Sequence, residues 1–186
     1  MNKKKIFIAV DTNKISKAKR IIRETQINKI KIGYKFGLEF FYSKEGRKFI
    51  SSLKNQIIFL DLKLNDIPNT IVSAMKSLKN LKISYLTVHL SSGMSALRAL
   101  RKESKNIKIA GVTTLTSLNN KDLKEIGYSK KVNELVKHQV KLAKKAKLDA
   151  IVCSGHEIRS VKKVFKKEII TPGIKIHNTK NDQKRV

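Results

Sequence analysis

The chain has 186 residues, of which 40% are hydrophobic, and a formal net charge of +28. This length and composition suit a single folded domain over residues 1–186, with a full hydrophobic core. The longest apolar runs fall far short of the roughly 18 residues that cross a bilayer, and no signal-peptide pattern follows the basic N-terminus, so we expect a cytoplasmic protein with no membrane partner.

Short β-branched runs alternate along the chain with longer segments of helical periodicity. Strands are predicted at residues 6–10, 30–32, 57–62, 85–89, 107–112, 150–153 and 169–171. Amphipathic helices are predicted at residues 16–23, 45–53, 68–78, 92–103, 131–146 and 156–165. This continuous alternation is typical of a parallel α/β sheet.

Polar residues follow nearly every predicted strand. They are Asp11, Lys31 with Gly33, Asp61 with Lys63, His89, Thr113 with Thr116, Ser154, and Pro172 with Gly173. A ring of polar groups from successive strands is typical of the active site of a TIM barrel, whereas an open sheet gathers its site at one switch point. The sequence therefore predicts a TIM (β/α)8 barrel with seven strands, in which the chain ends at Val186 before the eighth βα unit.

The high positive charge suggests an anionic partner, because Lys and Arg neutralise phosphates. However, lysine outnumbers arginine about five to one and is spread along the whole chain, whereas nucleic-acid recognition relies heavily on arginine. We therefore expect no nucleic-acid partner. The single cysteine, Cys153, and the four histidines lack metal-ligand spacing, so no metal site is expected either.

The segment from Ile57 to Thr70 carries the clearest chemical signal. Asp61 and Lys63 are two residues apart in a predicted strand, so they point to the same face, and Asp66 follows in the next loop. A surface ion pair would explain them, but the preceding Ile-Ile-Phe-Leu run indicates a buried strand. Together with Lys31 they form a predicted array of alternating charges that keeps a lysine protonated, and hence able to act as a general acid.

The sequence D-L-K-L-N-D-I-P-N-T at 61–70 resembles the D-x-K-x-x-D-I-P-N-T signature of the orotidine 5′-phosphate decarboxylase family. Further similar segments are I-A-V-D at 8–11, I-K-I-G at 30–33, V-H-L-S-S-G at 88–93, V-T-T-L-T-S at 112–117, D-A-I-V-C-S at 149–154, and T-P-G-I-K and D-Q-K-R-V within 171–186. The resemblance covers the chain from about Ile6 to its last residue.

This resemblance implies a homodimeric carboxy-lyase that converts orotidine 5′-monophosphate to uridine 5′-monophosphate and carbon dioxide, without a cofactor. The implied catalytic residues are Lys63, which protonates C6, Asp61 beside the scissile carboxylate, Lys31 in the charge array, and Asp66 acting in the partner's site. The implied substrate-binding residues are Asp11, Lys31, Asn69, Thr70, Thr116, Pro172, Lys175 and Gln183.

Three alternatives remain open at this point. A sugar-phosphate decarboxylase or aldolase of the same suprafamily shares D-x-K-x-x-D but uses a magnesium-bound enediolate, and I-P-N-T favours the nucleotide enzyme instead. A basic anion-binding protein would use the net charge of +28. A non-catalytic remnant is the third alternative, because the sequence stops before an eighth strand, and we expect these 186 residues alone not to be a competent enzyme.

Overall fold

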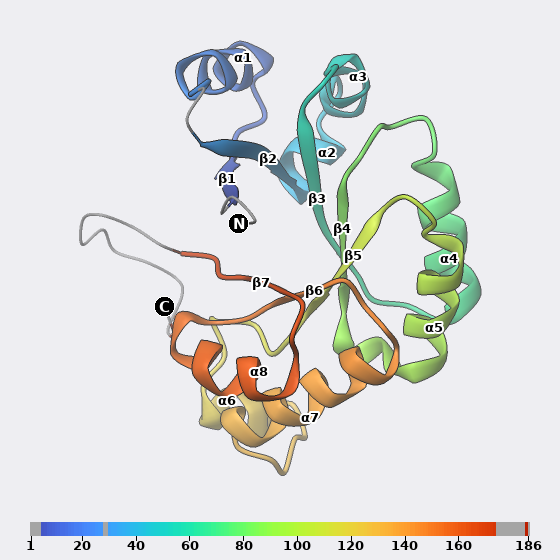
Figure 1. Cartoon of the computed structure of the whole chain (residues 1–186), viewed down its shortest axis with the longest axis vertical. Helices are drawn as coiled ribbons and strands as arrows, with labels where there is room; N and C mark the ends of the chain where they lie inside the picture. Colours follow the sequence, from blue (N-terminus) through green and yellow to red (C-terminus); the bar gives the residue numbers. More distant parts are fainter. Residues whose placement is uncertain (1–4, 28–29, 174–184, 186) are drawn as a thin grey trace.

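The computed structural model describes residues 5–27, 30–173 and 185. One sheet contains seven parallel strands that follow the chain order from β1 to β7. The strands are β1 (Lys5–Ala9), β2 (Lys31–Gly37), β3 (Ile57–Leu64), β4 (Tyr85–His89), β5 (Lys108–Val112), β6 (Ala150–Val152) and β7 (Glu168–Ile170). Figure 1 shows the sheet curving into part of a barrel, with the helices outside it. The predicted α/β barrel with seven strands is confirmed.

The helices lie where the amphipathic segments predict them, with two additions. They are α1 (Ile15–Glu24), α2 (Leu38–Tyr42), α3 (Gly46–Ser52), α4 (Pro68–Ser77), α5 (Gly93–Glu103), α6 (Asn120–Glu125), α7 (Val132–Lys145) and α8 (Ile158–Val164), with 3-10 turns η1 (Leu90–Ser92) and η2 (Gly155–Glu157). The sequence did not predict α2 and α6, which have only 5 and 6 residues. Such short helices lack a full amphipathic period, and α6 depends on a capping box between Asn119 and Asp122.

Strand β2 differs most from its predicted position. The predicted strand ends at Ile32, whereas the observed strand begins at Lys31 and continues to Gly37. Lys31 pairs with Lys5 at the amino end of the sheet, and Gly37 pairs with Asp61. Because all strands are parallel, Lys31 lies at the opposite end of β2 from Asp61. The prediction that Lys31 follows the carboxyl end of a strand is therefore wrong.

Alternate side chains of each strand face opposite sides of the sheet, so the buried residues form two groups. Leu60, Leu86 and Ile109 are fully buried and belong to the core between sheet and helices. Residues of the other parity lie inside the barrel, where the Phe7 ring packs edge-on at 5.0 Å from Phe59 and 5.2 Å from Tyr85. A Cβ at Gly33 would lie 2.8 Å from the Phe7 ring, so the absence of a side chain there makes room for this aromatic cluster.

A polar cluster lies at the amino ends of the strands, and we call Lys5, Tyr85, Lys108 and Glu168 the amino-end cluster. Lys5 Nζ donates to Tyr85 Oη at 2.6 Å and to Glu168 Oε1 at 3.2 Å, and Tyr85 Oη donates to Glu168 Oε2 at 2.6 Å. Lys108 also donates to Glu168. Glu168 on β7 is thus joined to β1, β4 and β5 across the barrel interior.

The amino-end cluster shifts the acidity of two of its members. Burial raises the pKa of Glu168, but hydrogen bonds from Lys108, Tyr85 and Lys5 outweigh this effect and place the pKa below its ordinary value. Burial, together with the Glu168 carboxylate, raises the pKa of Tyr85 to about 12. At neutral pH the carboxylate is therefore charged and the phenol is protonated.

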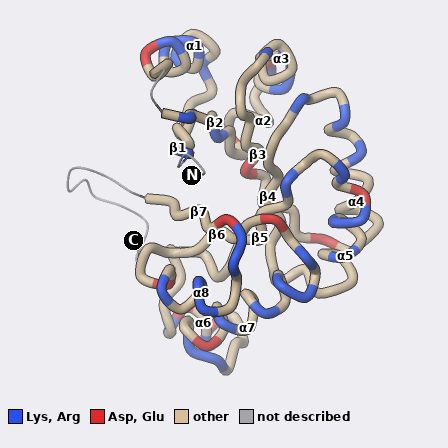
Figure 2. The backbone as a smooth tube through the Cα atoms, viewed as in Figure 1, with Lys and Arg blue, Asp and Glu red and all other residues tan. Residues whose placement is uncertain are grey.

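Basic residues are spread along the described part of the chain. Figure 2 shows Lys and Arg on several helices and loops of these residues. Among the described residues, no helix is both long and apolar enough to cross a membrane.

Candidate active site

Four charged side chains meet at the carboxyl ends of the first three strands, and we call Asp11, Lys35, Asp61 and Lys63 the carboxyl-end cluster. Lys63 Nζ lies 2.9 Å from Asp61 Oδ2. Lys35 Nζ lies 3.8 Å from the same oxygen and 3.5 Å from Asp11 Oδ1. The predicted array is Lys31, Asp61, Lys63 and Asp66. The observed order also alternates in sign, but Lys35 takes the place of Lys31 and Asp11 takes the place of Asp66.

The exchange of Lys31 for Lys35 follows from the length of β2. Lys31 is exposed at the amino end of the strand, whereas Lys35 lies four residues further along it and pairs with Ala9 and Phe59. Its side chain is 24% exposed, so it stays within the barrel mouth. The sequence contains K-x-G twice, at 31–33 and at 35–37, and only the second places its lysine beside Asp61.

The burial of the cluster increases toward its centre. The Asp61 side chain is 15% exposed, compared with 34% for Lys63 and 70% for Asp11. Asp61 also accepts a hydrogen bond at Oδ1 from Thr87 Oγ1 at 3.1 Å, and Thr87 is fully buried on β4. The cluster thus presents the Lys63 ammonium, held by a mostly buried carboxylate, to a molecule that enters the mouth of the barrel.

The backbone at Lys63 departs from ordinary strand geometry. Its φ is +49°, in the left-handed region that a residue with a side chain rarely adopts. The pairing of β3 with β4 shifts register between Leu60 and Leu64, so the strand bulges at this point. Such bulges occur next to active sites because they redirect a side chain.

His89 borders the carboxyl-end cluster at the end of β4. Burial, and next the positive charge of Lys63, lower the pKa of His89 from 6.5, and Asp61 only partly opposes them. The imidazole is therefore neutral at pH 7 and adds no positive charge beside Lys63.

The loop after β3 carries the other predicted residues of the signature. Asp66 is exposed, and its Oδ1 accepts a hydrogen bond from the Ile67 N–H at 2.7 Å. Asn69 and Thr70 are exposed in the first turn of α4, which begins at Pro68. These three side chains thus lie at the surface beside the mouth and outside the carboxyl-end cluster.

Thr116 lies in the segment that follows β5. Arg185, for which no role was predicted, holds this segment. Arg185 donates to the carbonyls of Thr114, Leu115 and Leu118 at 2.8–2.9 Å. Its guanidinium also forms an ion pair with the buried Glu157. Thr116 is partly buried, and Arg185 fixes the backbone on both sides of it.

The predicted phosphate-side residues are only partly described. Pro172 follows β7 and is partly buried, and Gly173 has φ +79°. Lys175 and Gln183 lie outside the described residues.

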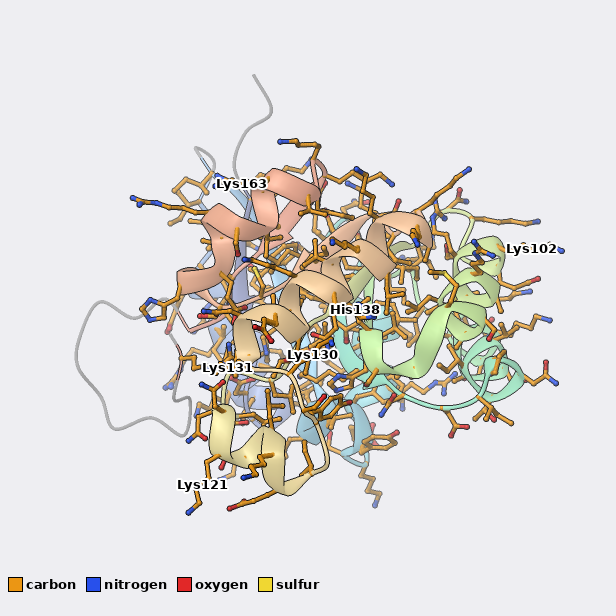
Figure 3. All side chains as sticks on the ribbon, turned by 90° about the horizontal axis from the view of Figure 1, so that it is seen from below. Lys102, Lys121, Lys130, Lys131, His138 and Lys163 are labelled. Atoms are coloured by element: carbon orange, nitrogen blue, oxygen red, sulfur yellow. The ribbon has the colours of Figure 1, made fainter. Side chains whose placement is uncertain are left out.

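Two further observations concern candidate metal ligands and the distribution of surface charge. Within residues 5–27, 30–173 and 185, no group of three or more His, Cys, Asp or Glu side chains could hold a metal ion. Figure 3 labels outward-pointing side chains on the helical side, and all of them are exposed: Lys102, Lys121, Lys130, Lys131, His138 and Lys163. Lysines on this side come from several helices and loops.

The sequence is similar to those of known proteins. The family profile described as "Orotidine 5'-phosphate decarboxylase / HUMPS family" matches residues 4–186. The orotidine 5′-phosphate decarboxylase of Carboxydothermus hydrogenoformans is 38% identical over 98% of this chain and 80% of its own length. That of a Wolbachia pipientis strain is 39% identical over 97% of this chain and 81% of its own length.

Solved structures agree with these sequence matches. The crystal structure of orotidine 5′-phosphate decarboxylase from Lactobacillus acidophilus is 28% identical, covers 85% of this chain and 75% of that chain, and has a TM-score of 0.78. The Methanocaldococcus jannaschii enzyme in complex with the inhibitor BMP is 22% identical, covers 94% of this chain and 80% of that chain, and has a TM-score of 0.77. The second similarity extends the shared fold to a more distant relative.

Proposed function

Because this chain belongs to the orotidine 5′-phosphate decarboxylase / HUMPS family, we propose that it decarboxylates orotidine 5′-monophosphate to uridine 5′-monophosphate in cytoplasmic pyrimidine biosynthesis. The observation that carries this proposal is the 2.9 Å contact between Lys63 Nζ and Asp61 Oδ2 at the mouth of the barrel. This contact puts a proton donor, Lys63, beside a fixed anion, Asp61, and the proposed reaction uses both groups.

The proposed roles of Asp61 and Lys63 follow from their charges. Loss of carbon dioxide leaves a carbanion at C6 of the pyrimidine, which needs a nearby fixed cation and then a proton. The Lys63 ammonium can provide both. The Asp61 carboxylate lies next to the position of the substrate carboxylate in this arrangement, so their repulsion falls when carbon dioxide leaves. No cofactor takes part in this proposal.

The remaining residues of the site would bind the nucleotide. Asp11 and Lys35 are proposed to contact the ribose hydroxyls, a role that the sequence had assigned to Asp11 and Lys31. Asn69 and Thr70 would lie beside the nucleotide, and Thr116 would contact the pyrimidine. On the phosphate side the proposed residues are Pro172, Lys175 and Gln183.

We further propose a homodimer in which Asp66 completes the partner's site. Asp66 is exposed beside the mouth, and the next residue, Ile67, is a large apolar side chain with 66% exposure. Tyr42 of α2, on the neighbouring βα unit, is 76% exposed. Exposed apolar groups around a charged loop are a suitable surface for a second copy of the chain.

The first experiment tests the substrate. Purified protein is incubated with orotidine 5′-monophosphate after exhaustive chelation, and the loss of the substrate's ultraviolet absorbance is followed. We expect the formation of uridine 5′-monophosphate to be independent of metal. Turnover of a β-keto sugar-acid phosphate that requires added magnesium, without turnover of the nucleotide, would contradict the proposal and support the sugar-phosphate alternative.

The second experiment tests the shared site. Inactive Lys63→Ala and Asp66→Ala subunits are mixed in equal amounts under conditions where subunits exchange. Random pairing makes half of the dimers mixed, each with one native site, so activity should recover to about one quarter of the native value. Absence of recovery, with exchange verified by mass labels, would contradict a contribution of Asp66 in trans.

A further inference from the structure

A buried hydroxyl lies beneath the Asp61–Lys63 pair and has no part in the function proposed so far. Thr87 is on β4, with 0% of its surface exposed. Its Oγ1 accepts a hydrogen bond from the Lys63 backbone N–H at 2.8 Å and lies 3.1 Å from Asp61 Oδ1. One side chain therefore contacts the backbone of the proposed acid and the carboxylate that orients it.

The contact with Lys63 is made at the strained point of β3. Lys63 has φ +49°, and the regular pairing of β3 with β4 is interrupted between Leu60 and Leu64. At such a bulge a backbone N–H loses its ladder partner and must find another acceptor when it is buried. The Thr87 hydroxyl is that acceptor, so it stabilises the conformation that directs the Lys63 side chain.

The contact with Asp61 has a fixed direction. A hydroxyl has one proton to donate, and the Lys63 N–H can only donate. The Thr87 proton is therefore free to point at Asp61 Oδ1, which accepts it as a carboxylate. With Oδ1 held in this way, Oδ2 is turned toward Lys63 Nζ at 2.9 Å and Lys35 Nζ at 3.8 Å.

We infer that Thr87 is a positioning residue for the reaction: its hydroxyl sets the left-handed backbone of Lys63 and the rotation of the Asp61 carboxylate together. The inference rests on the proposed function only in taking Asp61 and Lys63 as the reacting pair. Because Thr87 is buried beneath this pair, it acts through these two residues. Its removal should therefore lower turnover more than substrate affinity.

The test compares Thr87→Val, which removes the hydroxyl at nearly constant volume, with Thr87→Ser, which retains it. Tyr34→Phe is the matched control, since it removes another buried hydroxyl, which donates to the Ile22 carbonyl on the helix-facing side of the sheet. Misplacement of reacting groups by about 1 Å can cost about 100-fold in rate. We expect about a 100-fold lower kcat with KM within about threefold for Thr87→Val, and changes below about fivefold for Thr87→Ser and Tyr34→Phe.

A second measurement does not require activity. Amide hydrogen exchange at Lys63 should be at least about tenfold faster in Thr87→Val than in Thr87→Ser or the native chain, because the N–H loses its acceptor. Should Thr87→Val fail to fold, Thr87→Ala is measured against the same criteria. The exchange test does not depend on turnover, so a failure of the proposed function and a failure of this inference can be told apart.

Two results would overturn the inference. The first is native kcat in Thr87→Val together with unchanged protection of the Lys63 amide. The second is an equal loss of kcat in Thr87→Val and Tyr34→Phe, since that would indicate a general effect of removing a buried hydroxyl.

Discussion

The barrel contains two charge clusters, one at each end of its strands, and their construction differs. In the amino-end cluster the Glu168 carboxylate accepts hydrogen bonds from Lys5, Tyr85 and Lys108, which come from three other strands. In the carboxyl-end cluster the distances extend to 3.8 Å, and Lys63 has a left-handed backbone. In the first cluster three donors meet at one carboxylate, whereas in the second two carboxylates and two lysines alternate in a row.

This difference separates a stabilising network from a reactive one. Hydrogen bonds that saturate a carboxylate hold strands together, but they leave few hydrogen-bonding positions that a ligand could use. Strain and incomplete pairing are tolerated where the surrounding structure imposes them, and such places are often functional sites. Substitutions in the two clusters should therefore affect different properties, turnover at one end and stability at the other.

The largest expected effect is the loss of turnover in Lys63→Ala. Without the proposed proton donor and cation, kcat should fall by about 10³-fold or more, because general-acid catalysis and charge stabilisation are lost together. The thermal unfolding temperature should stay near the native value, since Lys63 is at the mouth. Kinetics and circular dichroism on the same sample check both. Near-native turnover would exclude Lys63 as the acid.

The second prediction compares the two lysines of β2. Lys35→Ala should lower kcat/KM by about 10- to 100-fold, because Asp11 and Asp61 lose the cation between them and their charges then repel. Lys31→Ala, an exposed substitution at the other end of the same strand, should change kcat/KM by less than about twofold. Equal effects of both variants would contradict the placement of Lys35 in the site.

The reason why the sequence misplaced this lysine is physical. K-I-G at 31–33 and K-F-G at 35–37 are equivalent in local pattern, and each has a glycine that weakens strand propensity. Only the register with β3, which pairs Gly37 with Asp61, decides between them. Pairing register is a tertiary property that periodicity within β2 does not contain.

Other parts of the site were predictable because they are local. Asp61 and Lys63 share one strand, so alternation alone places them on one face, and the 2.9 Å contact agrees with that prediction. In contrast, Arg185 joins residues about 70 positions away in sequence, and Glu168 reaches Lys5 on the first strand. Thr87 was missed because a threonine in a buried strand is ordinarily read as a packing residue.

The third prediction concerns stability at the amino end. Glu168→Gln removes the charge that accepts from Lys5 and Lys108 and leaves an amide facing them, so the free energy of unfolding should fall by about 1–2 kcal/mol after allowance for partial exposure. Turnover of the folded variant should stay close to native. Glu125→Gln, on the exposed surface of α6, is the control and should change stability by less than about 0.5 kcal/mol. Urea unfolding measures both variants.

The smallest expected effect is a pH dependence. The folded-state pKa of Glu168 is depressed, so its stabilisation is present above the pKa of about 4.3 of an unfolded Glu. It is lost as the pH falls through the lower folded pKa. The stability difference between the native chain and Glu168→Gln should therefore be constant from pH 7 to about pH 5 and shrink in more acidic solution. A difference that grows on acidification would contradict the assignment.

The burial of Cys153 makes its thiol a probe of local unfolding in the barrel. This residue, the single cysteine of the chain, is 2% exposed at the end of β6, and burial, then Glu157, raises the pKa of its thiol to about 12. Thiol reagents attack the thiolate, so the native protein should react with them only when this region unfolds. The rate at which the native cysteine is labelled thus reports local unfolding around β6, and no engineered cysteine is needed. Slower labelling in the presence of uridine 5′-monophosphate would measure how far ligand binding rigidifies the wall of the barrel.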